Sequence, residues 1–208
     1  MSRYLGSVCK LCRREQMKLF LKGDKCYTKC VFEKRSSTPG MAKPQRGKPS
    51  EYAIRLREKQ RLRRMVAINE VPFSRVVEKA SKSPLATGDE ILRSLEMRLD
   101  NVTRRLGLAT SLKTARQLVL HNHIKVAGKI VNIPSYAVRP GDVISLSPRL
   151  KDNVGVKLSL DSAKRQGNRP VYLEFNEAEF SGKVMRVPER GEMAFPITEQ
   201  LIIEYYSK

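Results

Sequence analysis

Residues 98–146, RLDNVTRRLGLATSLKTARQLVLHNHIKVAGKIVNIPSYAVRPGDVISL, carry the clearest pattern in this chain of 208 residues. Apolar residues recur at spacings of three or four from Leu92 to Leu106, which is typical of one face of a helix. Gly107 stands where that helix would end, because glycine adopts the left-handed conformation without a steric cost. Ser111 can cap a second helix. The first half of the stretch therefore predicts two short helices.

The second half of the stretch has the pattern of a hairpin followed by a strand. Ala127 and Gly128 stand between apolar residues and predict a tight turn, and Arg-Pro-Gly-Asp at 139–142 predicts another before a strand at 143–146. Basic side chains lie on the second helix and beside the hairpin. A preformed surface that carries cations suits a folded polyanion, so the stretch is a candidate nucleic-acid-binding module.

The composition points to the same kind of partner. The chain has 41 Lys and Arg against 21 Asp and Glu, a formal net charge of +20 and a pI near 10.1. Such an excess favours nucleic acid first and an anionic membrane second. No apolar run approaches the ~18 residues of a membrane span, and the N-terminus lacks the apolar core of a signal peptide. We expect a soluble cytoplasmic protein whose cysteines remain thiols.

The charge is unevenly distributed along the chain. Residues 1–70 contain 19 basic and 6 acidic residues, whereas residues 170–208 contain 4 basic and 7 acidic ones. A uniformly solvated basic surface would not show this gradient. We therefore expect the C-terminal tail to pack on protein while the rest of the chain faces nucleic acid.

Several blocks of sequence resemble a known family. LDNVTRRLG (99–107), ARQLV (115–119) and VNIPSY (131–136) resemble the small RNA-binding module named after ribosomal protein S-four. MSRYLG, CKLCRRE, KLFLKG, SEYAIRLREKQRLR and LIIEYYSK extend the resemblance, in the same order, over nearly the whole chain. The chain is identified as a member of this family in its cysteine-containing form. It departs from the family at residues 65–71, MVAINEV, where members have a Tyr-Gly pair and an acidic-basic-Gln-Phe run.

All four cysteines lie in one window of 22 residues, as a CxxC pair and a CxxxC pair separated by thirteen residues. Cys9, Cys12, Cys26 and Cys30 can each supply a thiolate to one tetrahedral centre, which suits a closed, structural Zn²⁺ site. An iron–sulfur cluster uses the same ligands and is the less favoured alternative. Four incidental or buried thiols are a further alternative. The resemblance supports zinc, since some members carry cysteines in this segment.

We predict an α+β protein in three parts. Residues 1–45 would form a zinc-binding basic N-terminal segment, whose end would belong to an irregular linker over 36–49. Residues 46–95 and 188–208 would form a small helical domain, with helices starting at Ser50, around Phe73 and after Pro196. Residues 96–187 would form an inserted RNA-binding domain of two helices packed on an antiparallel sheet. Strands at 171–175 and 184–187 would extend that sheet. The resemblance implies the same insertion.

We expect RNA contacts from three groups of side chains. One stripe of the helix from Ser50 carries cations every four residues; a solvated face is the alternative interpretation, but the charge density favours phosphate. His121 and His123 have a solvent-exposed or a base-stacking role, because a metal site would need further ligands. The N-terminal group is Arg3, Arg13, Arg14, Lys43, Arg46 and Lys48; the helix group is Arg55, Lys59 and Arg63. The module group is Arg104, Arg105, Ser111, Lys113, Arg116, Gln117, His121, His123, Lys125 and Lys129.

Two other classes of function fit the sequence poorly. An enzyme would need a nucleophile, a base and an orienting acid, or a Gly-rich phosphate loop, and neither pattern occurs. A zinc-dependent DNA regulator would show a capped reading helix tied to the cysteine pairs, and the thirteen-residue spacer shows none. Selectivity for structured RNA over duplex DNA separates the two binding functions.

The resemblance implies a structural, non-enzymatic role in the small ribosomal subunit. It implies early binding to small-subunit ribosomal RNA at a multi-helix junction in the five-prime domain. It also implies contact with small-subunit ribosomal protein five and other ribosomal proteins, an influence on translational accuracy, and a position near the channel through which messenger RNA enters. Some members repress their own messenger RNA. No membrane partner is expected.

Overall fold

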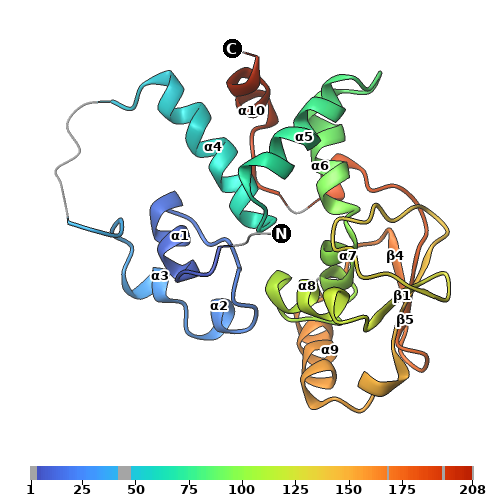
Figure 1. The fold of residues 1–208 in the computed structure, drawn as a ribbon. Coiled ribbons are helices and arrows are strands. Elements are labelled where there is room, and N and C mark those ends of the chain that lie inside the picture. The colour runs from blue at the N-terminus through green and yellow to red at the C-terminus, as the bar shows by residue number, and fades with distance from the viewer. Residues whose placement is uncertain (1–3, 42–47, 168, 194, 208) are drawn as a thin grey trace. The chain divides into compact units, whose positions relative to one another are not determined.

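The computed structural model describes residues 4–41, 48–167, 169–193 and 195–207 (Figure 1). The predicted RNA contacts of Arg3, Lys43 and Arg46 lie outside these residues. The chain divides into two compact units. The terminal unit contains the chain up to Ile91 and again from Phe195, and the central unit contains the chain between them. The predicted boundaries at residues 45, 95 and 187 stay a prediction, because compactness does not show which parts fold independently.

The terminal unit is helical. Its elements are α1 (Val8–Glu15), α2 (Lys25–Thr28), α3 (Val31–Lys34), α4 (Glu51–Met65), α5 (Glu70–Ser81) and α10 (Glu199–Tyr206). Helix α4 starts where the sequence predicts, because the Ser50 hydroxyl accepts a hydrogen bond from the Ala53 N–H at 3.2 Å. Pro72 lies in the first turn of α5, where a missing N–H costs no helical hydrogen bond.

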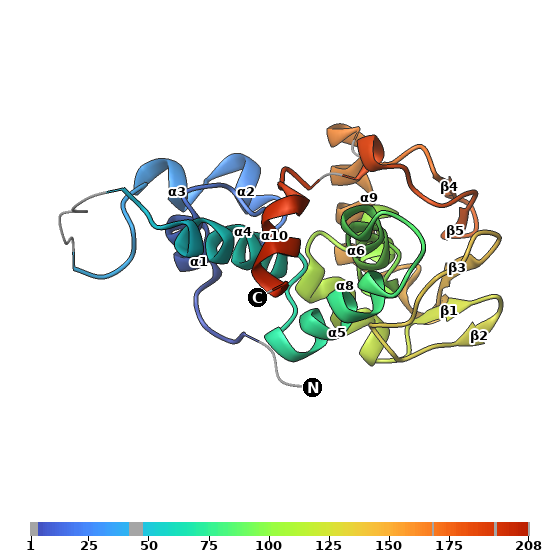
Figure 2. The same ribbon diagram turned by 90° about the horizontal axis from the view of Figure 1, so that it is seen from above.

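Helix α10 returns the end of the chain to α4. It lies along α4 in Figures 1 and 2, dark red against cyan. Ile202 of α10, Leu62 of α4 and Phe73 of α5 are fully or almost fully buried. The tail therefore packs on protein, as its acidic and apolar composition predicts.

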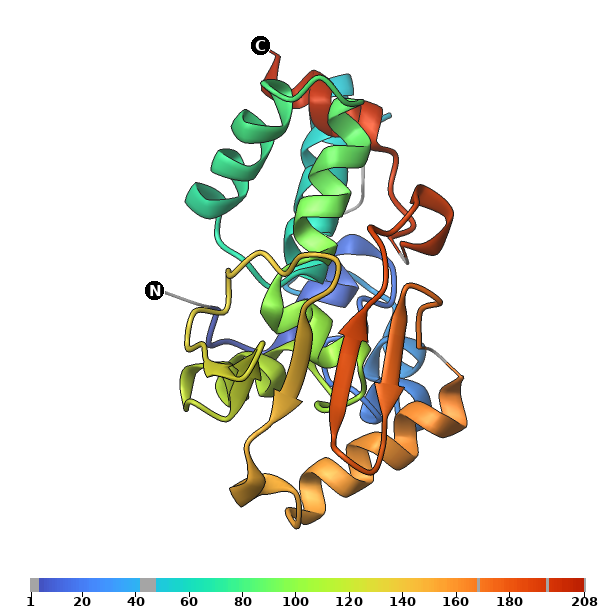
Figure 3. The ribbon, with the colours of Figure 1, turned by 90° about the vertical axis from the view of Figure 1, so that its right-hand side faces the viewer.

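The central unit packs helices on an antiparallel sheet (Figure 3). Helix α6 (Thr87–Glu96) leads into it. Its other elements are α7 (Leu99–Arg105), α8 (Leu112–Leu120), β1 (Ile124–Val126), β2 (Lys129–Ile130), β3 (Val143–Leu146), α9 (Val154–Gln166), β4 (Leu173–Asn176) and β5 (Ser181–Val184), with 3-10 turns at Pro148–Leu150 and Arg190–Glu192. The strand order is β2-β1-β3-β5-β4, with every neighbouring pair antiparallel. The predicted α+β class is confirmed.

One face of the sheet forms the core of the central unit. Ile124, Val126, Ile144 and Leu146 alternate along β1 and β3 and are buried with side chains of α7, α8 and α9. Alternation places the residues between them on the other face of the sheet. Gly182 of β5 allows α7 to come close, because a Cβ there would overlap Leu106.

The local signals of the module are confirmed. Gly107 has φ +88° after α7, and the Ser111 hydroxyl accepts a hydrogen bond from the Thr114 N–H at 3.2 Å. Ala127 (φ 47°) and Gly128 (φ 79°) form the two-residue turn between β1 and β2.

Three expectations about elements are wrong. The apolar stripe to Leu106 is not one helix: it breaks at Met97, whose carbonyl accepts from the Val138 N–H at 2.9 Å. The Leu99 N–H donates to Tyr136 O at 2.9 Å, so pairing with a distant loop interrupts the helix. Helix α9 stands where no regular element was predicted. Strand β5 covers residues 181–184 instead of 184–187, since the register is set by pairing with β3 and β4.

Candidate nucleic-acid interface

The outer face of α8 is set by what the helix buries. Leu112, Ala115 and Val119 are buried, so the positions between them turn outward. Lys113 is partly exposed and Gln117 is exposed. The predicted module therefore presents a cation and an amide from one short helix.

The turn from α8 to β1 brings the two histidines together. The His121 N–H donates to Gln117 O and the His123 N–H to Leu118 O, both at 3.0 Å. Asn122 between them has a left-handed φ of 63°, which asparagine tolerates better than most residues. The two imidazole rings lie with centroids 6.2 Å apart. Both rings therefore belong to one locally fixed turn.

The hairpin carries two more of the predicted cations. Because Ile124 and Val126 are buried, Lys125 between them lies on the outer face of the sheet. Lys129 is exposed at the start of β2. The helix–hairpin surface, as we name it, comprises Lys113, Gln117, His121, His123, Lys125 and Lys129.

Other predicted module residues have partners within the protein. The Arg105 guanidinium is buried, and its Nε lies 2.6 Å from Glu96 Oε1. Arg116 Nη1 lies 3.4 Å from Asp100 Oδ2, and Ser111 is buried as the cap of α8. Arg104 is partly exposed. RNA contact by these four residues stays a prediction, and the contacts given for Arg105, Arg116 and Ser111 are structural.

The cationic row predicted on α4 faces other parts of the terminal unit. Arg55 Nε lies 2.7 Å from Glu204 of α10, and the Lys59 amine lies 2.6 Å from Glu70 of α5. Arg63 Nε lies 3.6 Å from the same Glu70. The hydrogen bond to Glu204 raises the pKa of Arg55. The row that the spacing assigned to RNA thus neutralises acidic side chains of the protein.

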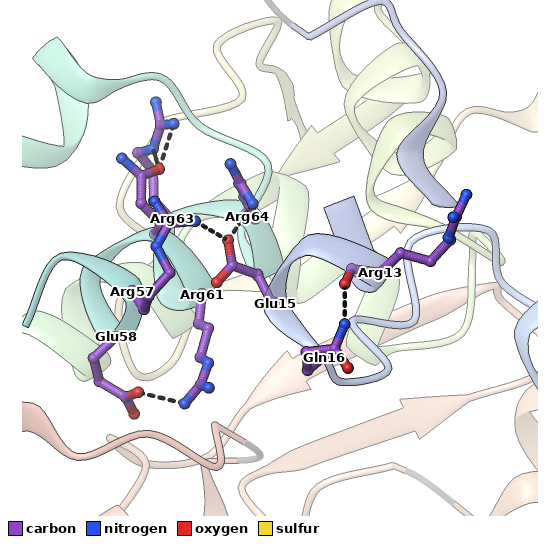
Figure 4. Close-up of polar contacts among 9 residues, drawn as sticks. Arg13, Glu15, Gln16, Arg57, Glu58, Arg61, Arg63 and Arg64 are labelled. Atoms are coloured by element: carbon purple, nitrogen blue, oxygen red, sulfur yellow. Dashed lines mark hydrogen bonds and ion pairs between the residues drawn. The ribbon is translucent and has the colours of Figure 1, made fainter. Parts of the chain in front are cut away.

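A second cationic side of α4 was missed by the sequence interpretation. Figure 4 shows Arg57 and Arg64 of α4 pointing toward Glu15 of α1, and Arg61 toward Glu58. Arg57 Nη1 lies 3.3 Å from Glu15, and Arg61 Nη1 lies 2.7 Å from Glu58. The signal was present, since Arg57, Arg61 and Arg64 recur at spacings of four and three.

In the N-terminal segment, Arg13, which was predicted to contact RNA, makes hydrogen bonds within the segment. The Arg13 guanidinium donates to Ser37 O at 2.8 Å and to Thr38 O at 3.4 Å, which ties the start of the linker to α1. Arg14 and Lys48 are exposed. Of the described residues predicted here for RNA, these two remain accessible.

The four thiols lie in one neighbourhood. Cys12, Cys26 and Cys30 are buried and Cys9 is partly exposed. Burial raises the pKa of the Cys12 thiol, and electrostatic interaction with the other three cysteines raises it further. The Lys22 N–H donates to Cys26 Sγ at 3.3 Å. Four thiols, one of which accepts a hydrogen bond from a backbone N–H, are ligands of the type that zinc prefers.

The thiols are not drawn together into a coordination sphere. Among residues 4–41, 48–167, 169–193 and 195–207, no three His, Cys, Asp or Glu side chains are arranged so that they could hold a metal ion. The zinc site predicted from Cys9, Cys12, Cys26 and Cys30 therefore stays a prediction. No helix in this described part has the length and apolar character to span a membrane.

Comparison with known proteins covers the whole chain. Residues 3–96 match the family model "Ribosomal protein S4/S9 N-terminal domain", and residues 97–144 match the "S4 domain". The chain is 51% identical over 209 residues to "Small ribosomal subunit protein uS4" of Thermodesulfovibrio yellowstonii, 48% over 209 to that of Pelotomaculum thermopropionicum and 47% over 210 to that of Thermus thermophilus. In each case 100% of both chains is covered. The chain belongs to the uS4 family of small ribosomal subunit proteins.

Proposed function

We propose that this chain is a structural, non-enzymatic component of the small ribosomal subunit and binds small-subunit ribosomal RNA. Its place is then the ribosome, in the cytoplasm. The observation that carries the proposal is full-length similarity to proteins named uS4, together with an S4 domain whose helix–hairpin residues are exposed or partly exposed and include three lysines. Ribosomal RNA and neighbouring ribosomal proteins are the partners that this role requires.

The mechanism is neutralisation of phosphates by a rigid surface. Lys113, Lys125 and Lys129 would contact the backbone, while Gln117 and the two histidines can donate hydrogen bonds or stack on bases. Because the positions come from a capped helix and a tight turn, the cations are fixed before RNA arrives. Such a surface selects RNA by its shape more than by its sequence.

The proposal extends to a specific place in the subunit. The chain would bind early, at a multi-helix junction in the five-prime domain of the ribosomal RNA. It would contact small-subunit ribosomal protein five, influence translational accuracy, and lie near the channel through which messenger RNA enters. Support for these finer points is the family membership alone.

Binding to small-subunit ribosomal RNA at increasing salt tests the proposal. We expect affinity to fall about a thousandfold or more between roughly 50 and 200 mM monovalent salt, because several phosphates are neutralised. Protection of the five-prime domain in a footprint on protein-free RNA would support the finer assignment. A flat salt response, or equal affinity for duplex DNA of the same length, would contradict the proposal.

We also propose that Cys9, Cys12, Cys26 and Cys30 bind one Zn²⁺. The purified protein should then contain one zinc per chain, and chelation should unfold the N-terminal segment, because so small and charged a segment buries little apolar surface. Elemental analysis and far-UV circular dichroism before and after chelation test this. Substitution by Co²⁺ should give the absorption of a tetrahedral thiolate site. Iron with visible absorption as purified would favour a cluster, and no metal would overturn the proposal.

A further inference from the structure

The two rows of cations on α4 lie on different sides of the helix. Residues two apart are separated by about 200° around an α-helix, so Arg55, Lys59 and Arg63 cannot share a face with Arg57 and Arg61. The first row lies against α10 and α5, as its ion pairs show. The second row lies beside α1, whose Glu15 pairs with Arg57 and Arg64.

The side of α4 that faces α10 is electrically balanced. Its three cations meet three carboxylates. Arg55 pairs with Glu204 at 2.7 Å and with Glu51 at 3.0 Å. Lys59 and Arg63 pair with Glu70 at 2.6 and 3.6 Å. Among the residues that the structure describes, these pairs leave no unbalanced positive charge on that side to attract an external anion.

The side that faces α1 carries an excess of positive charge. Arg57 and Arg64 meet there on Glu15, Arg14 of α1 lies close enough to repel Arg64, and Arg61 follows on the same stripe of α4, paired with Glu58. The carboxylates paired with these four cations in the described residues are Glu15 and Glu58. Burial lowers the pKa of Arg64, and repulsion from Arg57, Arg63 and Arg14 lowers it further despite Glu15. Guanidinium groups at this density are better tolerated when an anion lies against them.

Two α4 cations of this side are accessible, while the Arg64 side chain is 18% exposed, as is that of Arg55 on the other side. The side chains of Arg57 and Arg61 are 36% and 35% exposed, whereas that of Lys59 is 4% exposed. The Glu15 side chain is fully buried, and one of its oxygens receives both Arg57 and Arg64. Glu15 of α1 thus anchors two guanidinium groups of α4, but its single negative charge balances only one of them.

We propose that α4 binds the phosphate backbone of RNA through Arg14, Arg57, Arg61 and Arg64, which we name the α1–α4 face, and not through Arg55, Lys59 and Arg63. This inference rests on the proposed ribosomal RNA binding and assigns it a second surface in the terminal unit. Arg57 and Arg61 contact phosphates, since a guanidinium can bind a phosphate through two parallel hydrogen bonds. Glu15 is a positioning residue, because it holds Arg57 and Arg64 from α1.

Two double variants of the full-length protein with the same change in charge test the assignment. Arg57→Gln with Arg61→Gln removes two cations of the α1–α4 face; Arg55→Gln with Arg63→Gln removes two from the side facing α10. We expect the first variant to bind small-subunit ribosomal RNA about tenfold or more weakly, with the slope of log affinity against log salt reduced by about 2. The second should keep the wild-type slope and lose thermal stability, because it breaks pairs with Glu204 and Glu70.

The outcomes are distinguishable. Circular dichroism at the assay temperature shows whether each variant is folded, and the single variant Arg61→Gln, which leaves both Glu15 pairs intact, replaces the first variant if that one unfolds. Equal losses of affinity and slope in the two double variants would overturn the assignment to the α1–α4 face. If the wild-type protein itself binds ribosomal RNA without salt dependence, the proposed function fails instead.

Discussion

At the scale of single residues, Glu96 is the polar centre of the central unit. Its side chain is fully buried and accepts hydrogen bonds from the Tyr172 hydroxyl at 2.7 Å and the Asn101 amide at 2.8 Å, beside the ion pair with Arg105 at 2.6 Å. Burial and the Glu96 charge raise the pKa of Tyr172, so its hydroxyl remains a donor. A buried charge pair of this kind is costly to break because one partner is left without its counter-charge.

Glu96→Gln should lower the free energy of unfolding by about 3 kcal/mol or more, since Arg105 would keep a buried charge with no carboxylate opposite. Tyr172→Phe removes one hydrogen bond and leaves the ion pair, so it should cost about 1–2 kcal/mol. Urea unfolding followed by circular dichroism measures both. A larger loss for Tyr172→Phe than for Glu96→Gln would show that the ion pair is not the dominant contact.

Gly182 shows a different constraint, which is steric. Gly182→Ala should destabilise the protein by about 1–3 kcal/mol, because the added Cβ would overlap Leu106, the buried residue that directly follows α7. Gly191→Ala is the matched control, since nothing in the described part of the chain lies within 4 Å of a Cβ there. Thermal melts of the two variants should differ clearly, and identical melts would mean that α7 shifts freely to accept the methyl group.

Sequence predicts residues that act locally and fails for those that act through distant partners. Gly107 and Ser111 were predicted correctly, because a helix end and a helix cap depend on a few neighbouring residues. The contacts of Arg105 and Lys59 could not be predicted in the same way. Lys59 meets Glu70 and the ring of Tyr205, 4.3 Å from its amine, and only the tertiary fold brings α10 there.

At the scale of elements, Glu70 joins three helices of the terminal unit. Its carboxylate, at the start of α5, accepts hydrogen bonds from the Lys59 amine of α4 at 2.6 Å and from the Tyr206 hydroxyl of α10 at 2.7 Å. Burial raises the pKa of Glu70, but the hydrogen bonds from Lys59 and Tyr206 outweigh it, so its pKa lies below the ordinary value of 4.5. The ionised form is therefore the one that stabilises the packing of α4, α5 and α10.

Glu70→Gln should lower the free energy of unfolding at pH 7 by about 1 kcal/mol, a modest value because the side chain is 43% exposed and solvent screens the pair. A carboxylate whose pKa is lowered by folding stabilises the folded protein at pH values above its pKa in the unfolded state. That contribution to the free energy of unfolding is lost as the pH falls through the pKa of the folded state. The difference between wild type and variant should thus shrink below pH 4.5. Urea unfolding at pH 7 and pH 4 tests this, with Glu174→Gln, an exposed carboxylate of β4, as the control. A difference that persists at low pH would contradict it.

The elements that sequence predicts are those that carry their own boundaries. Helices α4 and α8 each begin at a serine cap, and the β1–β2 turn needs only Ala127 and Gly128. The break before α7 was missed because it depends on hydrogen bonds with residues 134–138. The start of α4 was predicted correctly, but the spacing of its cations alone does not say which side α10 covers, and RNA contact by α4 stays a prediction.

At the scale of the whole molecule, one unit is continuous and the other is not. The central unit uses residues 92–194, whereas the terminal unit needs both ends of the chain. The central unit has its own sheet and its own apolar core. It therefore has what a domain needs to fold without α10.

A chain ending after Met193 should keep the central unit and lose the packing of α4. Hydrogen exchange should show wild-type protection in β1, β3 and β5, and fast exchange in α4, whose Leu62 is covered in the complete terminal unit. The intact protein in the same buffer is the reference. Loss of protection in both units would mean that the central unit depends on the C-terminal helix.

The position of α10 at the far end of the chain has a consequence during translation. Synthesis is vectorial, so α4 leaves the ribosome long before Glu204, the counter-charge of Arg55, exists. Until then the flank of α4 that α10 covers stays open, with Arg55 lacking one of its two counter-charges, and a nascent copy could adhere to ribonucleotide polymers through that flank as well. When the last helix packs, it would cover that flank and leave one side of α4 available for RNA. The finished protein would then bind RNA more selectively than its nascent chain.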